Sequence, residues 1–459
     1  MRRYLLSIVL LACTSALFAV SPSGTLPVMY ITTKNNQSVS RDEPVDATLY
    51  VTAYGSYPAT GSPTNQIPLT IKGRGNWTWS GFDKKPYKIV FAKGQGQKLL
   101  GMHKSKHWAL LAGADDWLGY LKNTVGYFLS QRIGLPYTPQ QVPVELVLNG
   151  DYQGLYFVTE TIRIDNDRVN IHEQNDGDTD PSVITGGWLV EIDNYYKEGN
   201  IEFREHNGQW IMITPESPEV LSSAQRTYIT DQMYALNDAI YNKGNESLED
   251  ILDIPDAARF YLVQEIMEDC ESYHGSCYLY KDRDSIVNSQ LSTCKWHFGP
   301  VWDFGNAYDR HQERFIYDHP SFSQIWIEQL CQHKVFYEQL MQLWKKYRAE
   351  GHSKVLEDID AFVSQISSAA QRDAQRWNGM GNVCDNSDMS WRKQEFLSRM
   401  NWRIDWLYSQ WGEGNTPFSD VQQPSSDQPV KTAIRFSDGQ LLIERNGQFF
   451  TITGVPVNQ

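Results

Sequence analysis

The amino-acid sequence predicts an α+β protein, strand-rich in its N-terminal part and helix-rich in its C-terminal part, with a small β tail. Short apolar runs rich in β-branched and aromatic residues, separated by polar turns, fill the first part of the chain. Longer segments with apolar residues at three- and four-residue steps fill the second part. Because strands and helices do not alternate, an α+β domain is favoured over an alternating α/β domain.

The first predicted strands surround a glycine turn. The strands span residues 28–31, 47–51, 67–72 and 87–91, and the turn is Gly73-Arg74-Gly75-Asn76. Backbone N–H groups in such a turn can approach an anion, and Lys84, Lys85 and Lys88 follow closely in the sequence. The alternative is an ordinary hairpin with a solvated basic edge, and the residues alone leave both interpretations open.

A helix and a hairpin follow. Apolar residues at helical spacing predict a helix over 118–132, with Asp115 and Asp116 as the expected N-terminal caps and Gly134 near its end. Strands at 142–148 and 155–159 flank an Asn-Gly turn, which is typical of a β-hairpin. Glu160 ends the second strand, where its carboxylate either orients a lysine or is an exposed strand-end acid. A further strand is expected at 188–193.

The second half is predominantly helical. Helices are predicted over 222–241, 255–267, 336–350, 355–377 and 391–411, and strands over 278–281 and 295–302. Residues 413–431, with their Pro, Ser, Asp and Gln, have the composition of a linker. Residues 432–459 contain three β-like pieces with Asp-Gly and Asn-Gly turns, which predict a small β tail.

The N-terminus has the pattern of a secretory signal peptide over residues 1–22. Met1-Arg2-Arg3 is basic, and residues 5–19 are largely apolar but too few for a stable membrane span. Leu10-Leu11-Ala12-Cys13 is similar to a bacterial lipobox, so a lipid anchor at Cys13 is the alternative to cleavage near Ala19. The mature protein is expected to be extracytoplasmic, secreted or at the cell surface, without a transmembrane helix.

The amino-acid composition limits the kinds of ligand and partner that the protein is expected to bind. The formal net charge of -14 argues against a broad nucleic-acid surface, which needs clustered Lys and Arg, but leaves nucleotide binding open. The 15 Trp, 25 Tyr and 18 Phe fit either large core fillers or a glycan-stacking surface. Five cysteines follow Cys13, and their spacing to His274 and His297 lacks the paired C-x-x-C pattern of structural zinc sites. Buried thiols or one disulfide are therefore favoured.

The residues that point to a catalytic activity lie between positions 260 and 310. This stretch contains EDCESYHGSCYLYKD and, further on, WHFGPVWDFGNAYD. A loop carboxylate after a helix, then a hairpin that ends in Trp302-Asp303-Phe304-Gly305, is an arrangement that phosphoryl transfer uses. One carboxylate orients the hydroxyl nucleophile, and the second holds magnesium on the phosphates.

Together these motifs resemble the CotH kinase family (spore coat protein H-like), in its exported, Bacteroidota-type branch. The resemblance extends from about Leu26 to Asp309, in the order RGN, KKPYKI, LLGM, VELVLNGDYQGLYFVTE, GGWLVEID, YLYKD and GPVWDFG. It implies an atypical protein-kinase-like fold over residues 24–412 that binds ATP with Mg²⁺ or Mn²⁺. The implied partner is an exported or surface protein, phosphorylated on Ser or Thr. Residues 432–459 also resemble the C-terminal sorting modules of exported Bacteroidota proteins.

The resemblance assigns roles to individual residues. Asp303 matches the metal-binding aspartate of the family, and Glu271 falls at the position of its catalytic aspartate. Ser276 stands where a metal-binding asparagine is expected. Arg74 matches the nucleotide-contacting turn of the family. Lys88, or alternatively Lys85, matches its phosphate-contacting lysine, and Glu160 matches the acidic partner of that lysine.

Three departures from the family pattern leave two functions open. Glu271 is one methylene longer than the expected aspartate, Ser276 is a neutral hydroxyl, and Gly305 replaces the second acid of the WDxD stretch. Misplacement of a catalytic group by about 1 Å costs on the order of a hundredfold in rate. One hypothesis is an active kinase, and the other is an inactive surface-display module that contacts a glycan or a protein. A glycoside hydrolase using Glu160 and Glu191 has no supporting motif.

Overall fold

The computed structural model describes residues 20–414, except 194, 207, 245–246, 288–289, 321–323, 378–379 and 381, and the backbone of four strands beyond residue 431. Contacts divide the chain into two units, one that ends at Gly414 and one that begins at Asn415. Residues 1–19 of the predicted signal peptide, with the lipobox cysteine, lie outside the described residues, as do residues 415–431 of the predicted linker.

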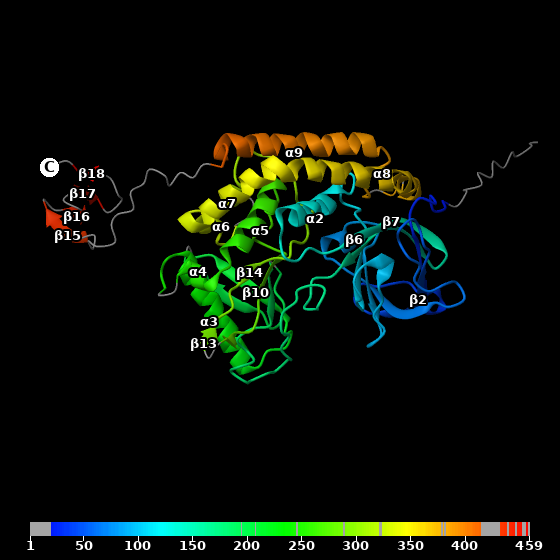
Figure 1. Cartoon of the computed structure of the whole chain (residues 1–459), viewed down its shortest axis with the longest axis horizontal. Helices are drawn as coiled ribbons and strands as arrows, with labels where there is room; N and C mark the ends of the chain where they lie inside the picture. Colours follow the sequence, from blue (N-terminus) through cyan, green and yellow to red (C-terminus); the bar gives the residue numbers. More distant parts are fainter. Residues whose placement is uncertain are drawn as a thin grey trace, which may run out of the picture. The chain divides into compact units, whose positions relative to one another are not determined.

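Seven strands form a closed barrel in the order β1-β2-β3-β4-β5-β7-β6 (Figure 1). They are β1 (Val28–Thr33), β2 (Val45–Val51), β3 (Ile67–Gly73), β4 (Tyr87–Phe91), β5 (His107–Leu111), β6 (Gln141–Leu148) and β7 (Asp151–Glu160). The barrel closes because β1 pairs with β2 on one side and, in parallel, with β6 on the other. Alternate apolar side chains, such as Met29, Ile31 and Leu49, fill its interior.

Two helices interrupt the barrel strands. The short α1 (Trp77–Ser80) follows the glycine turn, and α2 (Leu121–Ile133) connects β5 to β6. Asp116 caps α2, because its carboxylate accepts hydrogen bonds from the backbone N–H groups of Leu118 and Lys122 at 2.9 and 3.0 Å. Gly134 ends the helix with a positive φ.

A second sheet has the order β14-β11-β8-β10-β9. Its strands are β8 (Trp188–Ile192), β9 (Ile201–Arg204), β10 (Trp210–Ser217), β11 (Cys277–Lys281) and β14 (His297–Phe298). A small hairpin, β12 (Ser285–Val287) and β13 (Gln290–Ser292), lies between the last two in sequence. The helices α3 (Ser223–Ile240), α4 (Leu248–Ile251) and α5 (Ile254–Ile266) connect β10 to β11.

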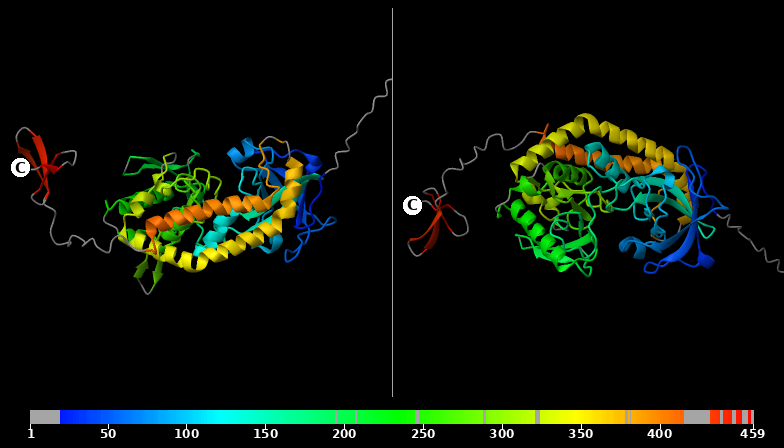
Figure 2. Two further views of the ribbon diagram at one scale, coloured as in Figure 1. Left: turned by 90° about the horizontal axis from the view of Figure 1, so that it is seen from above. Right: turned by 60° about the horizontal axis from the view of Figure 1, so that its bottom comes forward.

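The last helices of this unit run along both the barrel and the second sheet, as both views of Figure 2 show. They are α7 (Lys334–Lys346), α8 (His352–Trp377) and α9 (Met389–Trp411), and the short α6 (Ile327–Leu330) precedes them. A π-helical turn, Tyr347–Gly351, joins α7 to α8. Because α7 packs on α5 and α8 packs on β7, these helices tie the two sheets together.

The second unit contains one antiparallel sheet. Its strands are β15 (Thr432–Ser437), β16 (Gln440–Arg445), β17 (Gln448–Thr451) and β18 (Pro456–Val457), in sequence order. The three β-like pieces predicted from the sequence correspond to the first three of these strands.

The mixture of helices and strands agrees with the predicted α+β class, and the five predicted long helices are all present. The predicted helix over 118–132 begins only at Leu121, because Tyr120 has a left-handed backbone with φ 63°. The predicted strand over 295–302 is shorter, and β5, β9 and β10 were not predicted. Within the described residues, no helix combines the length and the apolar character that a membrane crossing needs.

Candidate functional site

A cavity of about 550 Å³ opens between residues of the barrel and residues of the second sheet. Its walls include the glycine turn with α1, the segment before β4, the β5–α2 connection, the start of α2, the end of β8, the loop before β11 and the Trp302–Asp309 turn. A space of this size fits a drug-sized ligand or a nucleotide.

Four of the residues that the sequence singled out line this cavity: Arg74, Glu271, Ser276 and Asp303. Three others do not. Lys85 donates its Nζ hydrogen bond to the backbone oxygen of Trp79 at 2.7 Å. Lys88 lies on β4 opposite Lys72, and partial burial followed by the charge of Lys72 lowers its pKa.

Glu160 lines a separate cavity of about 170 Å³. Its Oε2 accepts a hydrogen bond from the backbone N–H of Gln140 at 3.0 Å, and its Oε1 lies 3.9 Å from Nε of Arg168. Burial raises the pKa of Glu160. Its basic partners among the described residues are therefore Arg168 and His103, whose Nδ1 lies 3.7 Å from Oε1, rather than a lysine of the KKPYKI segment.

Lys84 is the lysine of that segment that reaches the main cavity. Its side chain is fully buried, and its Nζ lies 2.7 Å from Oδ1 of Asp373 on α8. The same carboxylate accepts hydrogen bonds from Tyr120 Oη and from the backbone N–H of Leu155, each at 2.7 Å. Burial lowers the pKa of Lys84, and Asp373 opposes that shift. This pair was not predicted, because nothing in the sequence links residues almost 300 positions apart.

The turn that carries Asp303 is held by α2. The backbone N–H of Phe304 donates to Asn123 Oδ1 at 3.0 Å, and Lys122 Nζ donates to the backbone oxygen of Gly305 at 2.8 Å. Asp303 itself has φ 60°, a left-handed conformation that aspartate tolerates better than most residues. Two neighbouring side chains on one helix therefore fix the direction of the Asp303 carboxylate.

Glu271 is oriented by the same turn. Asn306 donates a hydrogen bond from its side-chain amide to Glu271 Oε2. Asp269 lies just before it and is almost fully buried, and burial, followed by the charges of Glu271 and Asp303, raises its pKa well above the usual range. The loop thus presents one oriented carboxylate to the cavity, with a buried acid behind it.

Asp115 is a further acid of the cavity wall that sequence reasoning had placed at a helix cap. Both acids line the cavity, but the carboxylate of Asp116 is bonded to the start of α2, and that of Asp115 is not. Burial, followed by the charges of Asp116 and Asp303, raises the pKa of Asp115 to about 6. The doublet in the sequence did not reveal which of its two acids caps the helix.

A second acidic wall lies at the end of β8. Lys197 Nζ is 3.0 Å from Asp193, 3.4 Å from Glu191 and 3.5 Å from Glu216, so one cation serves three carboxylates. Burial raises the pKa of Glu191 to about 8, with the charges of Glu216 and Asp193 adding to the shift. This wall carries excess negative charge toward the cavity.

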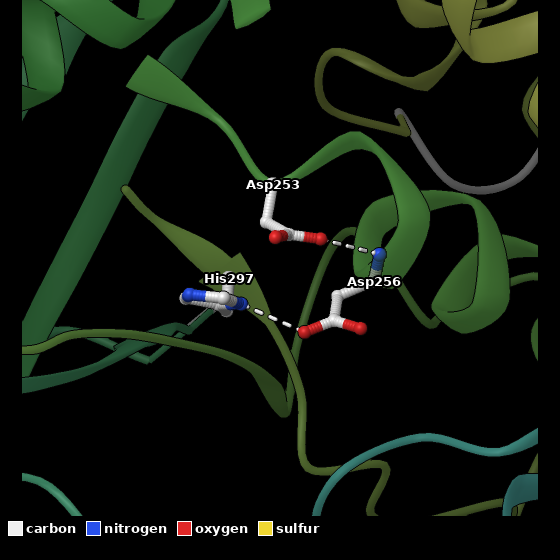
Figure 3. Close-up of side chains that lie close together, drawn as sticks. All are labelled: Asp253, Asp256 and His297. Carbon is white, nitrogen blue, oxygen red and sulfur yellow. Dashed lines mark hydrogen bonds and ion pairs between the residues drawn. The ribbon is translucent and has the colours of Figure 1, made fainter. Parts of the chain in front are cut away.

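Asp253, Asp256 and His297 form a group whose ligand-type atoms lie within 4.8 Å of one another (Figure 3). Its internal contacts account for it. Asp253 caps α5 by accepting from the backbone N–H of Asp256 at 2.9 Å, and Asp256 pairs with His297 Nδ1 at 2.7 Å and with Arg259. The group therefore joins the start of α5 to β14.

The five cysteines within the described residues are free thiols: Cys270, Cys277, Cys294, Cys331 and Cys384. They supply no disulfide there. In the described part of the chain, the one group of three or more His, Cys, Asp or Glu with metal-like spacing contains no cysteine.

Comparison with models of protein families shows to which family the chain belongs. Residues 71–406 match the family model described as CotH kinase protein. The chain belongs to this family. The match begins later than the resemblance seen in the sequence motifs and continues through α7 and α8 into α9, so it includes Asp373. No curated protein matches the chain.

Proposed function

We propose that the protein is an extracytoplasmic CotH-type kinase that transfers the γ-phosphate of ATP to Ser or Thr of exported or surface proteins. In this proposal the fold is kinase-like: the barrel serves as the nucleotide-binding lobe and the second sheet with its helices as the catalytic lobe. The observation that carries the proposal is the single cavity that gathers Arg74, Lys84, Glu271, Ser276 and Asp303. Those are the residue types that phosphoryl transfer requires.

The donor set suits a divalent cation of the Mg²⁺ type, since it offers oxygen ligands. The carboxylate of Asp303 and the hydroxyl of Ser276 both line the cavity, and no cationic side chain pairs with Asp303 among the described residues. When bound, the cation neutralises charge on the phosphates. Asp303 and Ser276 would hold it.

The remaining residues bind phosphate or move a proton. Arg74 stacks over Trp302 at 5.4 Å, which holds its guanidinium at the cavity. Lys84, kept in place by Asp373, takes the phosphate-contacting role that the sequence assigned to Lys85 or Lys88. Glu271, oriented by Asn306, accepts the proton of the substrate hydroxyl.

The setting of the protein is part of the proposal. The N-terminal pattern supports export by a signal peptide, followed by release or by a lipid anchor at Cys13, and the motif order is similar to that of exported Bacteroidota proteins. The C-terminal β unit would then act in surface sorting. Because ATP is scarce outside cells, the substrate would be met during export or at the surface.

An inactive display module is the second candidate, and two exposed aromatic side chains favour it. Trp77 and Tyr195 line the cavity while remaining 68% and 53% exposed. Aromatic rings exposed beside a polar cavity suit stacking on a sugar or a peptide. In this candidate, the replacement of the second family acid by Gly305 would weaken cation binding.

A thermal-shift experiment with magnesium and ATP separates the two candidates. A ligand that binds only the native state at about 100 times its Kd stabilises that state by about 2.7 kcal/mol. We expect a rise of several degrees in Tm for the wild-type chain and none for Asp303→Ala, with phosphotransfer from labelled ATP lost in the same variant. If no nucleotide and metal combination shifts the wild type, the kinase proposal fails and the display module remains.

A further inference from the structure

Gly305 leaves a space beside Asp303 that another carboxylate enters. A Cβ atom built at residue 305 would lie 3.2 Å from Oδ1 of Asp303 and 3.9 Å from Oδ2 of Asp115. Both carboxylate oxygens therefore lie within 4 Å of one point. That point is where the side chain of an acid at position 305 would begin.

The carboxylate of Asp115 lines the cavity and does not cap α2. Its neighbour Asp116 is committed to the N-terminus of α2, and the Nζ of Lys122 is taken by Gly305 and Asp309. Among the described residues, no basic side chain forms an ion pair with Asp115 or with Asp303. The charge of Asp303 nevertheless raises the pKa of Asp115, and a cation bound between the two carboxylates would relieve this repulsion.

We propose that Asp115 supplies the second carboxylate of the divalent-cation site, in place of the acid that Gly305 lacks. The proposal rests on the proposed function, since it concerns the cation that Asp303 would hold. A Mg²⁺ site of this kind needs one or two carboxylates, with water and substrate phosphates as the other ligands. Asp303 and Asp115 meet that requirement from two separate segments of the chain.

The glycine at position 305 and the position of Asp115 at the cavity are also compatible with each other. A carboxylate at position 305 would crowd both Asp303 and Asp115 and would add a third negative charge at the same point. With glycine there, the acid from the β5–α2 connection can approach. The site then has two carboxylates, as many as the WDxD stretch supplies, although the second acid comes from a different element.

The test measures Mn²⁺ binding by the full chain in the presence of a non-hydrolysable ATP analogue. The electron paramagnetic resonance signal of free Mn²⁺ reports how much of the ion remains unbound. We expect Asp115→Asn to weaken Mn²⁺ binding about tenfold or more, and Asp303→Asn to weaken it at least as much. Asp253→Asn is the matched control, because asparagine also caps a helix, and it should bind as the wild type does.

A charge-swap variant protects the test against misfolding. Asp115→Asn combined with Gly305→Asp moves the carboxylate back to the family position and should restore Mn²⁺ affinity to within a few-fold of wild type. Gly305→Asp alone should bind no more tightly than the wild type. Asp115→Glu keeps a carboxylate and should retain most of the affinity.

The outcomes separate the two proposals. If Asp303→Asn loses Mn²⁺ and Asp115→Asn binds it normally, the role of Asp115 is refuted and the kinase proposal stands. If the wild type binds no Mn²⁺, or if Asp303→Asn leaves binding unchanged, the cation site itself is refuted and both proposals fail. Failure of the swap to restore binding in a folded variant also contradicts the role of Asp115.

Discussion

The cavity acids and the Asp253–Asp256–His297 group contain similar residues in opposite situations. In the second group every carboxylate has a partner inside the protein: a helix N-terminus, an imidazole or a guanidinium. Asp115 and Asp303 face a cavity and pair with no cation among the described residues. Close spacing alone would single out the Asp253–Asp256–His297 group, since among the described residues it alone meets the metal-like criterion.

The difference shows that partners, more than spacing, separate a structural acid from a ligand-binding one. An acid whose hydrogen bonds are satisfied internally stabilises the fold, and its removal costs stability. An acid that faces solvent-filled space without a partner costs stability to keep, and its removal should cost ligand binding instead. Three predictions test whether individual acids of the molecule act in stability or in ligand binding.

The Lys84–Asp373 pair should show the largest stability effect. Both side chains are almost completely buried, so removal of one leaves an uncompensated charge. We expect Asp373→Ala to lower the free energy of unfolding by about 3–5 kcal/mol, measured by urea denaturation. The substitution Gly154→Ala offers a second check of the packing around this carboxylate, because a Cβ at residue 154 would lie only 1.9 Å from Asp373 Oδ1.

The control for this prediction is the double variant Lys84→Met with Asp373→Leu. Apolar replacement of both partners of a buried pair is often neutral, so the double variant should recover much of the lost stability. It should nevertheless lose ATP binding, since Lys84 lines the cavity. Recovery of binding together with stability would contradict the phosphate-contacting role.

Glu191 lies between the two extremes, because it shares Lys197 with two other acids. Its pKa is raised from 4.5 to about 8, so the native state holds a proton that the unfolded chain releases between these pH values. Stability should therefore fall as pH rises from about 5 to 8, by at most about 5 kcal/mol, since each pKa unit corresponds to about 1.4 kcal/mol. Glu191→Gln should flatten this dependence in thermal unfolding. An unchanged slope would mean that Lys197 keeps Glu191 charged throughout.

The sequence predicted the elements of the fold better than their contacts. Period and turn signals located every barrel strand except β5, together with the five long helices, because those signals are local. The second sheet was only partly predicted. Strand β9 alternates over only four residues, and β10 does not alternate regularly, so neither gave a clear signal. The pairing of β8 with β10 on one side and with β11 on the other joins segments that are distant in the sequence.

The candidate site was predictable where motifs carried it. Arg74, Glu271, Ser276 and Asp303 were found by residue order and meet at one cavity. Lys84 was not separated from Lys85, because adjacent residues point in different directions and only packing decides which one is buried. Asp373 and Asp115 had no local signal, since each acts through a residue far away in the sequence.

Asp253 provides the smallest effect and the most direct comparison with the cavity acids. Its carboxylate caps α5, so Asp253→Ala should cost about 1 kcal/mol of unfolding free energy, and Asp253→Asn much less, because asparagine accepts the same hydrogen bond. Mn²⁺ affinity should remain at the wild-type value in both variants. If Asp253→Ala instead weakened Mn²⁺ binding while stability stayed unchanged, the group in Figure 3 would be the cation site, and internal partners would no longer mark an acid as structural.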